Sequence, residues 1–142
     1  MPNIYLIPSS PKEFDIEELK DFLRNMHDAK ASYLAASDRF WKNVQADSIC
    51  LFHKDKCIVG EGKMNGKTKY AGTEKSPVTK RPYALEIDFI PETIKLYKRP
   101  VRFAEVEAAL GLGKPLGWRV IQSLNMAGYS TVTSIAKKDG YE

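Results

Sequence analysis

The spacing of hydrophobic residues changes between a helical and a strand period along the chain. Between residues 16 and 27 apolar side chains recur every three or four positions, which predicts a helix with one buried stripe, and Asp15 is placed to cap it. Residues 48–53 and 57–64 are short apolar segments on either side of a polar turn, which predicts a β-hairpin. The alternation of apolar and polar residues over 83–90 predicts a further strand.

The rest of the pattern predicts additional strands and helices. Strands are predicted at 3–7, at 93–103 with an interruption at Pro100, and in WRVIQSL (118–124); helices are predicted at 104–110, stopped by Gly111, and at the end of the chain, capped by Asn125 or Ser130. Residues 29–36 are predicted to be a loop with a helical turn, and 65–82 a long polar loop. Short strands with few helices favour one α+β domain over residues 1–142, a small mixed β-barrel flanked by short helices, rather than a doubly wound sheet.

Composition places the chain among ordinary globular proteins. It has 142 residues, of which 43% are hydrophobic and 28% charged, and this is enough for one domain with a substantial core. No apolar run approaches the ~20 residues that span a membrane, and the first residues lack the basic region of a secretion signal. We therefore expect a cytoplasmic protein, in which Cys50 and Cys57 stay reduced as buried or half-buried thiols.

Positive charge is concentrated in the middle of the chain. The net charge is +4, and residues 63–102 hold ten positive and four negative side chains, a local excess of six. Segregation of this kind is typical of a face that meets phosphate groups, although an ordinary solvated surface has the same pattern. Charge alone leaves both interpretations open.

The sequence contains no recognisable set of catalytic or metal-binding residues. His27 and His53 are isolated, no second cysteine pair completes a zinc site, and GLG at 111–113 lacks the GxGxxG pattern of nucleotide-binding loops. Neither histidine has an obvious nucleophile near it in sequence, and Glu105 and Glu107 face different sides of the predicted helix. We therefore expect a binding protein with no metal, no cofactor and no catalytic residues of its own.

Two tryptophans stand at the starts of predicted strands, beside loop residues. Trp41 precedes the strand at 48–53, and Trp118 opens WRVIQSL. Each is either a core residue, since tryptophan is well buried in most proteins, or a platform on which a flat base stacks. Further stacking candidates are Tyr33, Tyr70 and Tyr83.

Several short motifs follow one another along the chain. The opening strand runs into PSSPKEFD, FWKNVQADSICLFH places an aromatic ahead of a strand, CIVGEGKM ends a strand with two glycines, and GWRVIQSL comes late in the chain. In this order the motifs resemble the EVE-like branch of the PUA superfamily, which is related to ASCH and YTH domains. Ala46-Asp47 stands where that family has Gly-Asp. The resemblance covers most of the chain.

The resemblance implies a pseudobarrel that holds a modified nucleobase in a pocket at one end. In the EVE-like and YTH-like groups the pocket is built from the loop after the first strand, the segment before the second strand and a late aromatic. Carried onto this chain, these are Ser9 and Ser10, Trp41 and Trp118, to which the stacking argument adds Tyr33 and Tyr83. Flanking phosphates would be held by the basic residues Lys63, Lys67, Lys69, Lys80 and Arg81.

The leading hypothesis is that the domain flips a methylated or hydroxymethylated base out of double-stranded DNA. The resemblance places such domains at the N-terminus of modification-dependent restriction endonucleases, so we expect a nuclease domain to be fused or missing. One alternative keeps the fold and binds RNA, through a modified or single-stranded nucleotide. A second is a small enzyme using the same pocket, for which Lys42 is the nearest nucleophile, without a visible activating partner. The last is a partner-binding module whose barrel mouth is filled.

Overall fold

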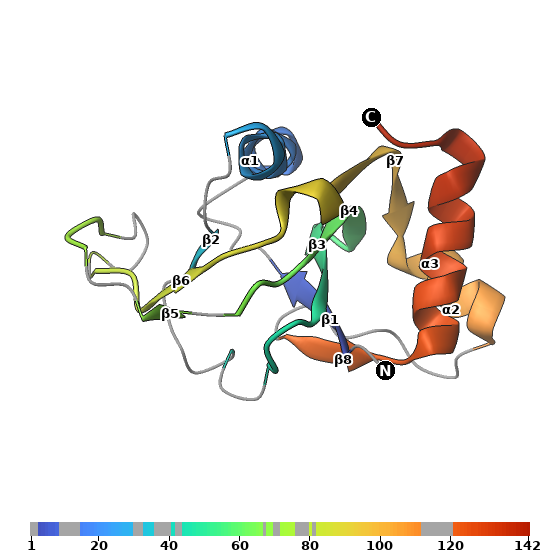
Figure 1. Cartoon of the computed structure of the whole chain (residues 1–142). Coiled ribbons are helices and arrows are strands. Elements are labelled where there is room, and N and C mark those ends of the chain that lie inside the picture. The colour runs from blue at the N-terminus through green and yellow to red at the C-terminus, as the bar shows by residue number, and fades with distance from the viewer. Residues whose placement is uncertain are drawn as a thin grey trace.

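The computed structural model describes residues 3–8, 15–29, 33–35, 41, 44–66, 68–69, 72–75, 80, 82–111 and 121–142. The elements along the chain (Figure 1) are β1 (Ile4–Pro8), α1 (Ile16–Asp28), β2 (Tyr33–Ala35), β3 (Ile49–Lys54), β4 (Cys57–Lys63), β5 (Thr68–Lys69), β6 (Leu85–Ile87), the 3-10 helix η1 (Pro91–Thr93), β7 (Lys95–Arg102), α2 (Phe103–Leu110), β8 (Gln122–Leu124) and α3 (Met126–Asp139). The predicted α+β class is confirmed. None of the described helices is both long and apolar enough to cross a membrane.

Five strands form the larger sheet, in the order β7-β4-β3-β1-β8. β1 runs parallel to β3, and the other neighbouring pairs are antiparallel. The predicted hairpin of β3 and β4 is confirmed; it turns at Asp55 and Lys56, whose φ angles of 53° and 62° give the left-handed geometry of a tight hairpin. Pro100 lies inside β7 without interrupting it, which an outer strand allows.

Three short strands form a second sheet, in the order β2-β6-β5. It joins the larger sheet just beyond β4, where Met64 pairs with Phe89 in an isolated bridge. Next to this bridge the N–H of Asn65 donates to the carbonyl of Asp88 at 2.8 Å. The two sheets are therefore continuous through the end of β4. Among the described strands, β7 and β8 are the outer strands of the larger sheet and do not pair with each other.

α1 and the smaller sheet cover one face of the larger sheet. Asp15 caps α1 as predicted, because its side chain accepts a hydrogen bond from the N–H of Glu18 at 2.8 Å and the Glu18 side chain accepts one in return. The buried stripe of α1, formed by Leu19, Leu23 and Met26, packs into a core cluster with residues of β1, β3, β4 and the smaller sheet.

The close packing of α1 on β4 requires a glycine. A Cβ atom at Gly60 would lie 2.6 Å from the carbonyl oxygen of Lys95 and 2.8 Å from Cδ1 of Leu23. The register of β4 against β7 also shifts between Ile58 and Gly60. The glycine-containing end of CIVGEGKM thus lets a helix and a neighbouring strand approach β4 closely.

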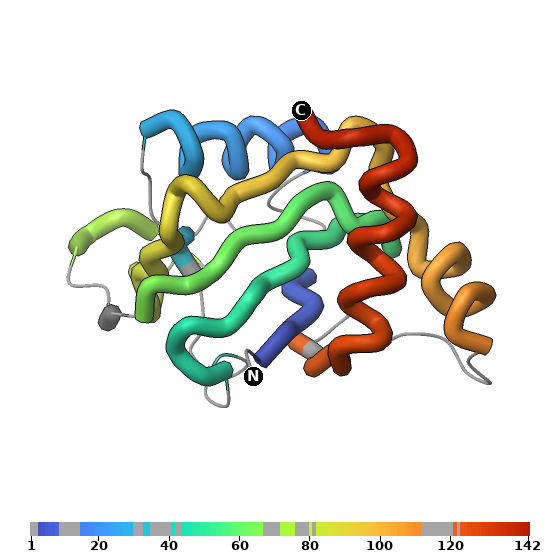
Figure 2. Tube along the Cα trace, turned by 45° about the vertical axis from the view of Figure 1, so that its right-hand side comes forward, coloured from blue at the N-terminus to red at the C-terminus, as the bar shows by residue number. Residues whose placement is uncertain are grey.

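α2 and α3 lie over the opposite face of the larger sheet, where a second core cluster forms (Figure 2). Val132 and Ala136 are the buried residues of α3 in this cluster. Of the two predicted caps, Asn125 is the one used, and its side chain accepts a hydrogen bond from the N–H of Gly128 at 2.8 Å. α2 ends at Gly111, as predicted, with a φ angle of 64°.

Two segments predicted to be loops contain strands instead. Within 29–36, residues Tyr33–Ala35 form β2, which pairs with β6 so that Tyr33 lies opposite Ile87. Within 65–82, β5 also pairs with β6, and Lys75 and Pro82 form an isolated bridge. Segments this short carry no hydrophobic period of their own. They form strands because they pair with β6, where the alternation of apolar and polar residues is plain in the sequence.

Candidate functional site

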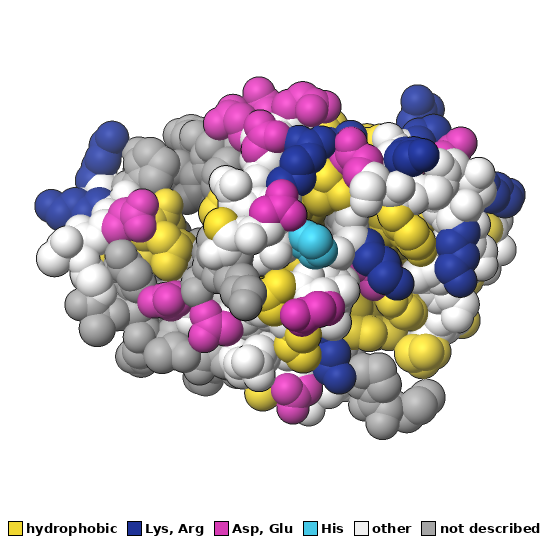
Figure 3. Space-filling model, turned by 45° about the horizontal axis from the view of Figure 1, so that its top comes forward, with side chains coloured by type: hydrophobic (Ala, Val, Ile, Leu, Met, Phe, Trp, Pro, Cys, Tyr) yellow, Lys and Arg dark blue, Asp and Glu magenta, His cyan; other side chains and the backbone are white. Residues whose placement is uncertain are grey.

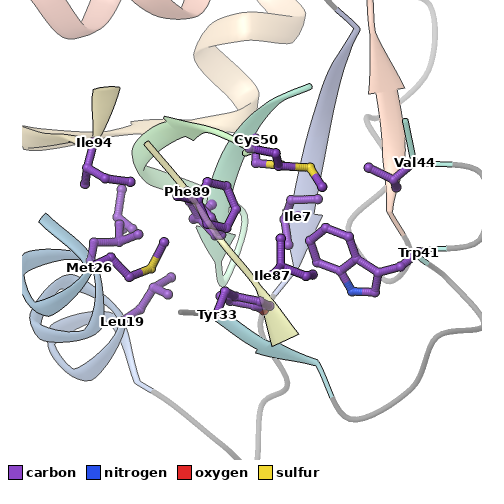
Figure 4. Packing of buried hydrophobic residues seen from close by; sticks show 14 of the residues in the cluster. Ile7, Leu19, Met26, Tyr33, Trp41, Val44, Cys50, Ile87, Phe89 and Ile94 are labelled. Carbon is purple, nitrogen blue, oxygen red and sulfur yellow. The ribbon is translucent and has the colours of Figure 1, made fainter. Parts of the chain in front are cut away.

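Trp41 and Tyr33, two of the predicted pocket residues, lie together in the core cluster between the sheets (Figure 4). Their ring centroids are 5.7 Å apart, with the ring planes inclined by 50°. Tyr33 also packs on Phe52 at 5.5 Å and meets Phe22 and Phe89 edge-on at 5.7 Å and 6.5 Å. Four aromatic side chains therefore surround Tyr33.

Both residues are buried. Only 4% of Trp41 and 8% of Tyr33 is exposed. The N–H of Val44 donates to the carbonyl of Trp41 at 3.0 Å, and Figure 4 shows the indole beside Val44, Ile7 and Ile87. In this conformation the indole offers no free face to a base. Burial therefore favours the core alternative for Trp41, and stacking on it would require its neighbours to move.

Described residues near the segments that the resemblance assigns to a pocket lie at one end of the larger sheet. β1 and β8 are antiparallel with Leu6 opposite Gln122, so β1 ends at Pro8 near the place where β8 begins. Ile7 from the end of β1 and Trp41 belong to one core cluster, and Ile121, just before β8, packs against it. Ser9, Ser10, Tyr70 and Trp118 themselves lie outside the described residues.

Tyr83 does not belong to the core cluster that holds Trp41 and Tyr33. It is half-buried ahead of β6, and its N–H donates to the carbonyl of Glu74 at 3.2 Å. The core cluster around Trp41 includes its neighbour Ala84 but, among the described residues, not Tyr83 itself. The structure thus unites Tyr33 with Trp41 and leaves Tyr83 outside their cluster.

Of the predicted phosphate-binding residues, the structure describes the position of Lys63, Lys69 and Lys80. Lys63 is half-buried at the end of β4, beside the junction of the two sheets. Lys80 is exposed and has a φ angle of 61°. Lys69 belongs to β5 but its side chain is not described, and Lys67 and Arg81 lie outside the described residues.

A buried polar network that the sequence pattern did not predict lies on the other face, beneath α3. Glu61 is 4% exposed and accepts two hydrogen bonds, from the hydroxyl of Tyr97 at 3.0 Å and from that of Tyr129 at 2.6 Å. Burial, and then the proximity of Glu61, raise the pKa of both phenols, so both remain protonated donors. The available sequence signal was a single acidic residue inside an otherwise apolar strand.

Tyr141 extends this network towards the end of the chain. Its ring lies 5.8 Å from that of Tyr97, and the ammonium of Lys95 sits 5.3 Å above its centroid. The hydroxyl of Tyr141 is buried and has no hydrogen-bond partner among the described residues. Burial raises the pKa of this phenol as well.

His53 is a second buried polar group on this face. It is 1% exposed, and its ring packs edge-on against Phe103 with centroids 4.8 Å apart. Its Nε2 atom has no partner in the described part of the chain. Burial lowers the pKa of His53 to about 4, so the ring is neutral at pH 7. This is the environment of a core histidine.

The two cysteines are free thiols, as expected. Cys50 is buried and Cys57 half-buried, and the hairpin register places Cys50 opposite Gly62 and Cys57 opposite Lys54. The cysteines therefore do not face each other, and burial raises the pKa of the Cys50 thiol. The described residues contain no group of three His, Cys, Asp or Glu side chains that could hold a metal ion.

Comparison with known proteins identifies a shared fold. No protein-family model and no curated protein matches the sequence. Similar solved structures include the crystal structure of protein Atu2648 from Agrobacterium tumefaciens, which is 14% identical with a TM-score of 0.55 over 99% of each chain. A hypothetical protein from Leishmania major is 12% identical with a TM-score of 0.57, over 97% of this chain and 96% of the other. At such low identity the likeness concerns the fold alone.

Proposed function

We propose that the chain is an EVE-like pseudobarrel of the PUA type that reads a modified base in double-stranded DNA. The order of its sequence motifs supports this assignment. The described fold is compatible with it, because two continuous sheets with helices on both faces supply the walls that a pseudobarrel needs. The base would be flipped out of the duplex, at an unstacking cost of a few kcal/mol.

One observation carries the proposal. Residues around the end of β1, Trp41 and the start of β8 are far apart in sequence, yet Ile7 and Trp41 belong to one core cluster, and Ile121 packs against that cluster. Ile7 and Ile121 are described residues near Ser9, Ser10 and Trp118, which the resemblance assigns, together with Trp41, to the base pocket. A filled core needs no such coincidence, because any apolar residues would serve.

The burial of Trp41 refines its proposed role. A side chain that is 4% exposed suits the inner wall of a pocket better than an outer stacking platform. In the proposal Trp41, braced by Tyr33, forms that wall, while Trp118 supplies the stacking face and Ser9 and Ser10 contact the polar edge of the base. Stacking on one aromatic contributes about 1–3 kcal/mol, which offsets much of the unstacking cost.

The phosphate groups on either side of the flipped base would meet the basic residues Lys63, Lys67, Lys69, Lys80 and Arg81. Such contacts position a nucleic acid without reading its sequence. The proposal gives the chain no catalytic residue, so any cleavage would come from a separate nuclease domain. RNA remains the alternative ligand, because phosphate contacts alone do not distinguish it from DNA.

The two tryptophans provide the test, because they are the only ones in the chain. Trp41→Phe leaves Trp118 as the single indole reporter, and Trp118→Phe leaves Trp41. Each variant is titrated with duplexes containing one 5-methylcytosine, 5-hydroxymethylcytosine or N6-methyladenine, and with the unmodified duplex. We expect one modified duplex to quench Trp118 strongly and Trp41 weakly, and to bind at least tenfold more tightly than the unmodified duplex.

Equal affinity for all four duplexes at moderate salt would contradict base reading. Tighter binding of a single-stranded RNA of the same sequence would assign the chain to RNA instead. Quenching of Trp41 alone would contradict the assignment of the stacking face to Trp118.

A further inference from the structure

Exposed lysines gather where the end of α3 meets β7. Lys95 and Lys98 lie on β7, Lys137 and Lys138 lie in the last turn of α3, and all four are exposed. The N–H of Lys98 donates to the carbonyl of Gly140 at 3.1 Å, which holds β7 against the residue that ends α3. We call these four side chains the β7–α3 lysine face.

The positive charge of this face is not neutralised within the described part of the protein. Residues 95–99 and 137–142 together hold five positive and two negative side chains. Both acids are already paired: Asp139 accepts from Arg99 at 2.7 Å, and Glu142 accepts from Arg24 at 3.1 Å. None of the four lysines forms an ion pair within the described residues.

The surface around α1 has the opposite charge. Residues 15–28 hold five acidic and two basic side chains. In Figure 3 acidic side chains lie over α1 at the top, while lysine and arginine side chains gather on the side of α3 and β7. A polyanion that approached the molecule would be repelled by α1 and attracted to the lysine face.

Local structure explains each pair of lysines only separately. Lysines on an outer strand discourage pairing with other chains, and lysines in the last turn of a helix complement its dipole. Neither effect requires the two pairs of lysines to adjoin. Neither requires the nearby Asp139 and Glu142 to form ion pairs with Arg99 and Arg24. The combination places four exposed lysines on two adjoining elements.

We propose that the β7–α3 lysine face binds the phosphate backbone of a nucleic acid, outside the base pocket. The class of ligand rests on the proposed function, but the proposed function does not include this surface. β7 and β8 are the two outer strands of the larger sheet. Four strand spacings separate them, about 19 Å in a flat sheet, or about six nucleotides at 3.4 Å each. A nucleic-acid strand that is bound near β8 thus meets the lysine face several nucleotides away.

The test compares two triple variants with the same change of charge. Lys98→Gln, Lys137→Gln and Lys138→Gln together remove three charges from the lysine face. Lys63→Gln, Lys75→Gln and Lys80→Gln remove three near the smaller sheet and serve as the positive control, because the proposed function already assigns Lys63 and Lys80 to phosphate groups. Lys95 is kept because its ammonium packs on Tyr141. Affinity for an unmodified 20-base-pair duplex is measured over a range of salt concentrations, after urea denaturation has shown that both variants are folded.

We expect the slope of log Kd against log salt to fall by about 0.9 for each phosphate that the lysine-face variant no longer neutralises. An unchanged slope in that variant would overturn the inference. The inference would also be overturned if the lysine-face variant lost binding to poly-glutamate but still bound the duplex, because the face would then bind an acidic protein partner. Because the duplex is unmodified, a reduced slope supports the lysine face even if modified and unmodified duplexes bind equally and base reading fails.

Discussion

The hydroxyl of Tyr129 in α3 donates a 2.6 Å hydrogen bond to Oε2 of Glu61, a buried residue in the middle of β4. The other carboxyl oxygen accepts from Tyr97 of β7 at 3.0 Å. One buried acid thus ties the last helix and an outer strand to the centre of the larger sheet. Buried polar groups are costly unless all their hydrogen bonds are made, so this network holds α3 in one position.

We expect Tyr129→Phe to lower the free energy of unfolding by about 1–3 kcal/mol, because it leaves a buried oxygen of Glu61 without its donor. Urea denaturation at pH 7 measures the loss. Tyr141→Phe is the matched control, since the Tyr141 hydroxyl is buried without a partner among the described residues. It should change stability by less than about 0.5 kcal/mol. An equal loss in both variants would show that the hydrogen bond is not the source.

Trp41→Ala should lower the free energy of unfolding by about 3–5 kcal/mol, because the indole is 4% exposed and packs on Tyr33. Trp41→Phe should cost less, since a phenyl ring fills most of the space. Urea denaturation gives both values, and the emission of Trp41 in Trp118→Phe should be blue-shifted, as expected of a buried indole. A loss below about 1 kcal/mol for Trp41→Ala would place the indole outside the core in solution.

The elements predicted correctly from sequence are those with local signals. Asp15 caps α1 through Glu18, three residues away, and Asn125 caps α3 through Gly128, also three residues away. The β3–β4 hairpin likewise depends on neighbouring residues. The hydrophobic pattern does not predict β2 and β5, because both form by pairing with the distant β6.

In the candidate site, too, the sequence shows what is local but not the contacts between distant residues. The sequence singled out Trp41 and Tyr33 as aromatics, but their mutual contact depends on β2 and β6, which the chain brings together over some fifty residues. The network of Glu61, Tyr97 and Tyr129 joins three elements and has no local motif. Only the acid in an apolar strand hinted at it, and its partners are set by the tertiary fold.

Gly60→Ala should destabilise the protein by about 1–3 kcal/mol, because the new methyl group would lie 2.6 Å from a backbone carbonyl that cannot easily move. Gly128→Ala is the control. Its Cβ would lie 2.6 Å from Cδ1 and 2.7 Å from Cγ of Leu124, but these are side-chain atoms that can move, whereas the carbonyl beside Gly60 cannot, and alanine favours the helix by up to about 1 kcal/mol. Thermal or urea unfolding should therefore separate the two variants clearly. Equal stability would mean that α1 and β7 do not approach β4 this closely.

His53 should make stability fall as the pH is lowered. Its pKa is about 4 in the folded protein, because burial disfavours the charged ring, against about 6.5 when unfolded. The unfolded state therefore binds the proton first, so stability is complete above pH 6.5 and is lost as the pH falls towards 4. Between pH 7.5 and 4.5 this contribution amounts to about 2.5 kcal/mol. His53→Leu removes it, so the variant should lose that much less stability than the wild type when urea denaturation is repeated at the two pH values. Parallel losses in the two proteins would show that the ring is accessible to solvent and titrates normally in the fold.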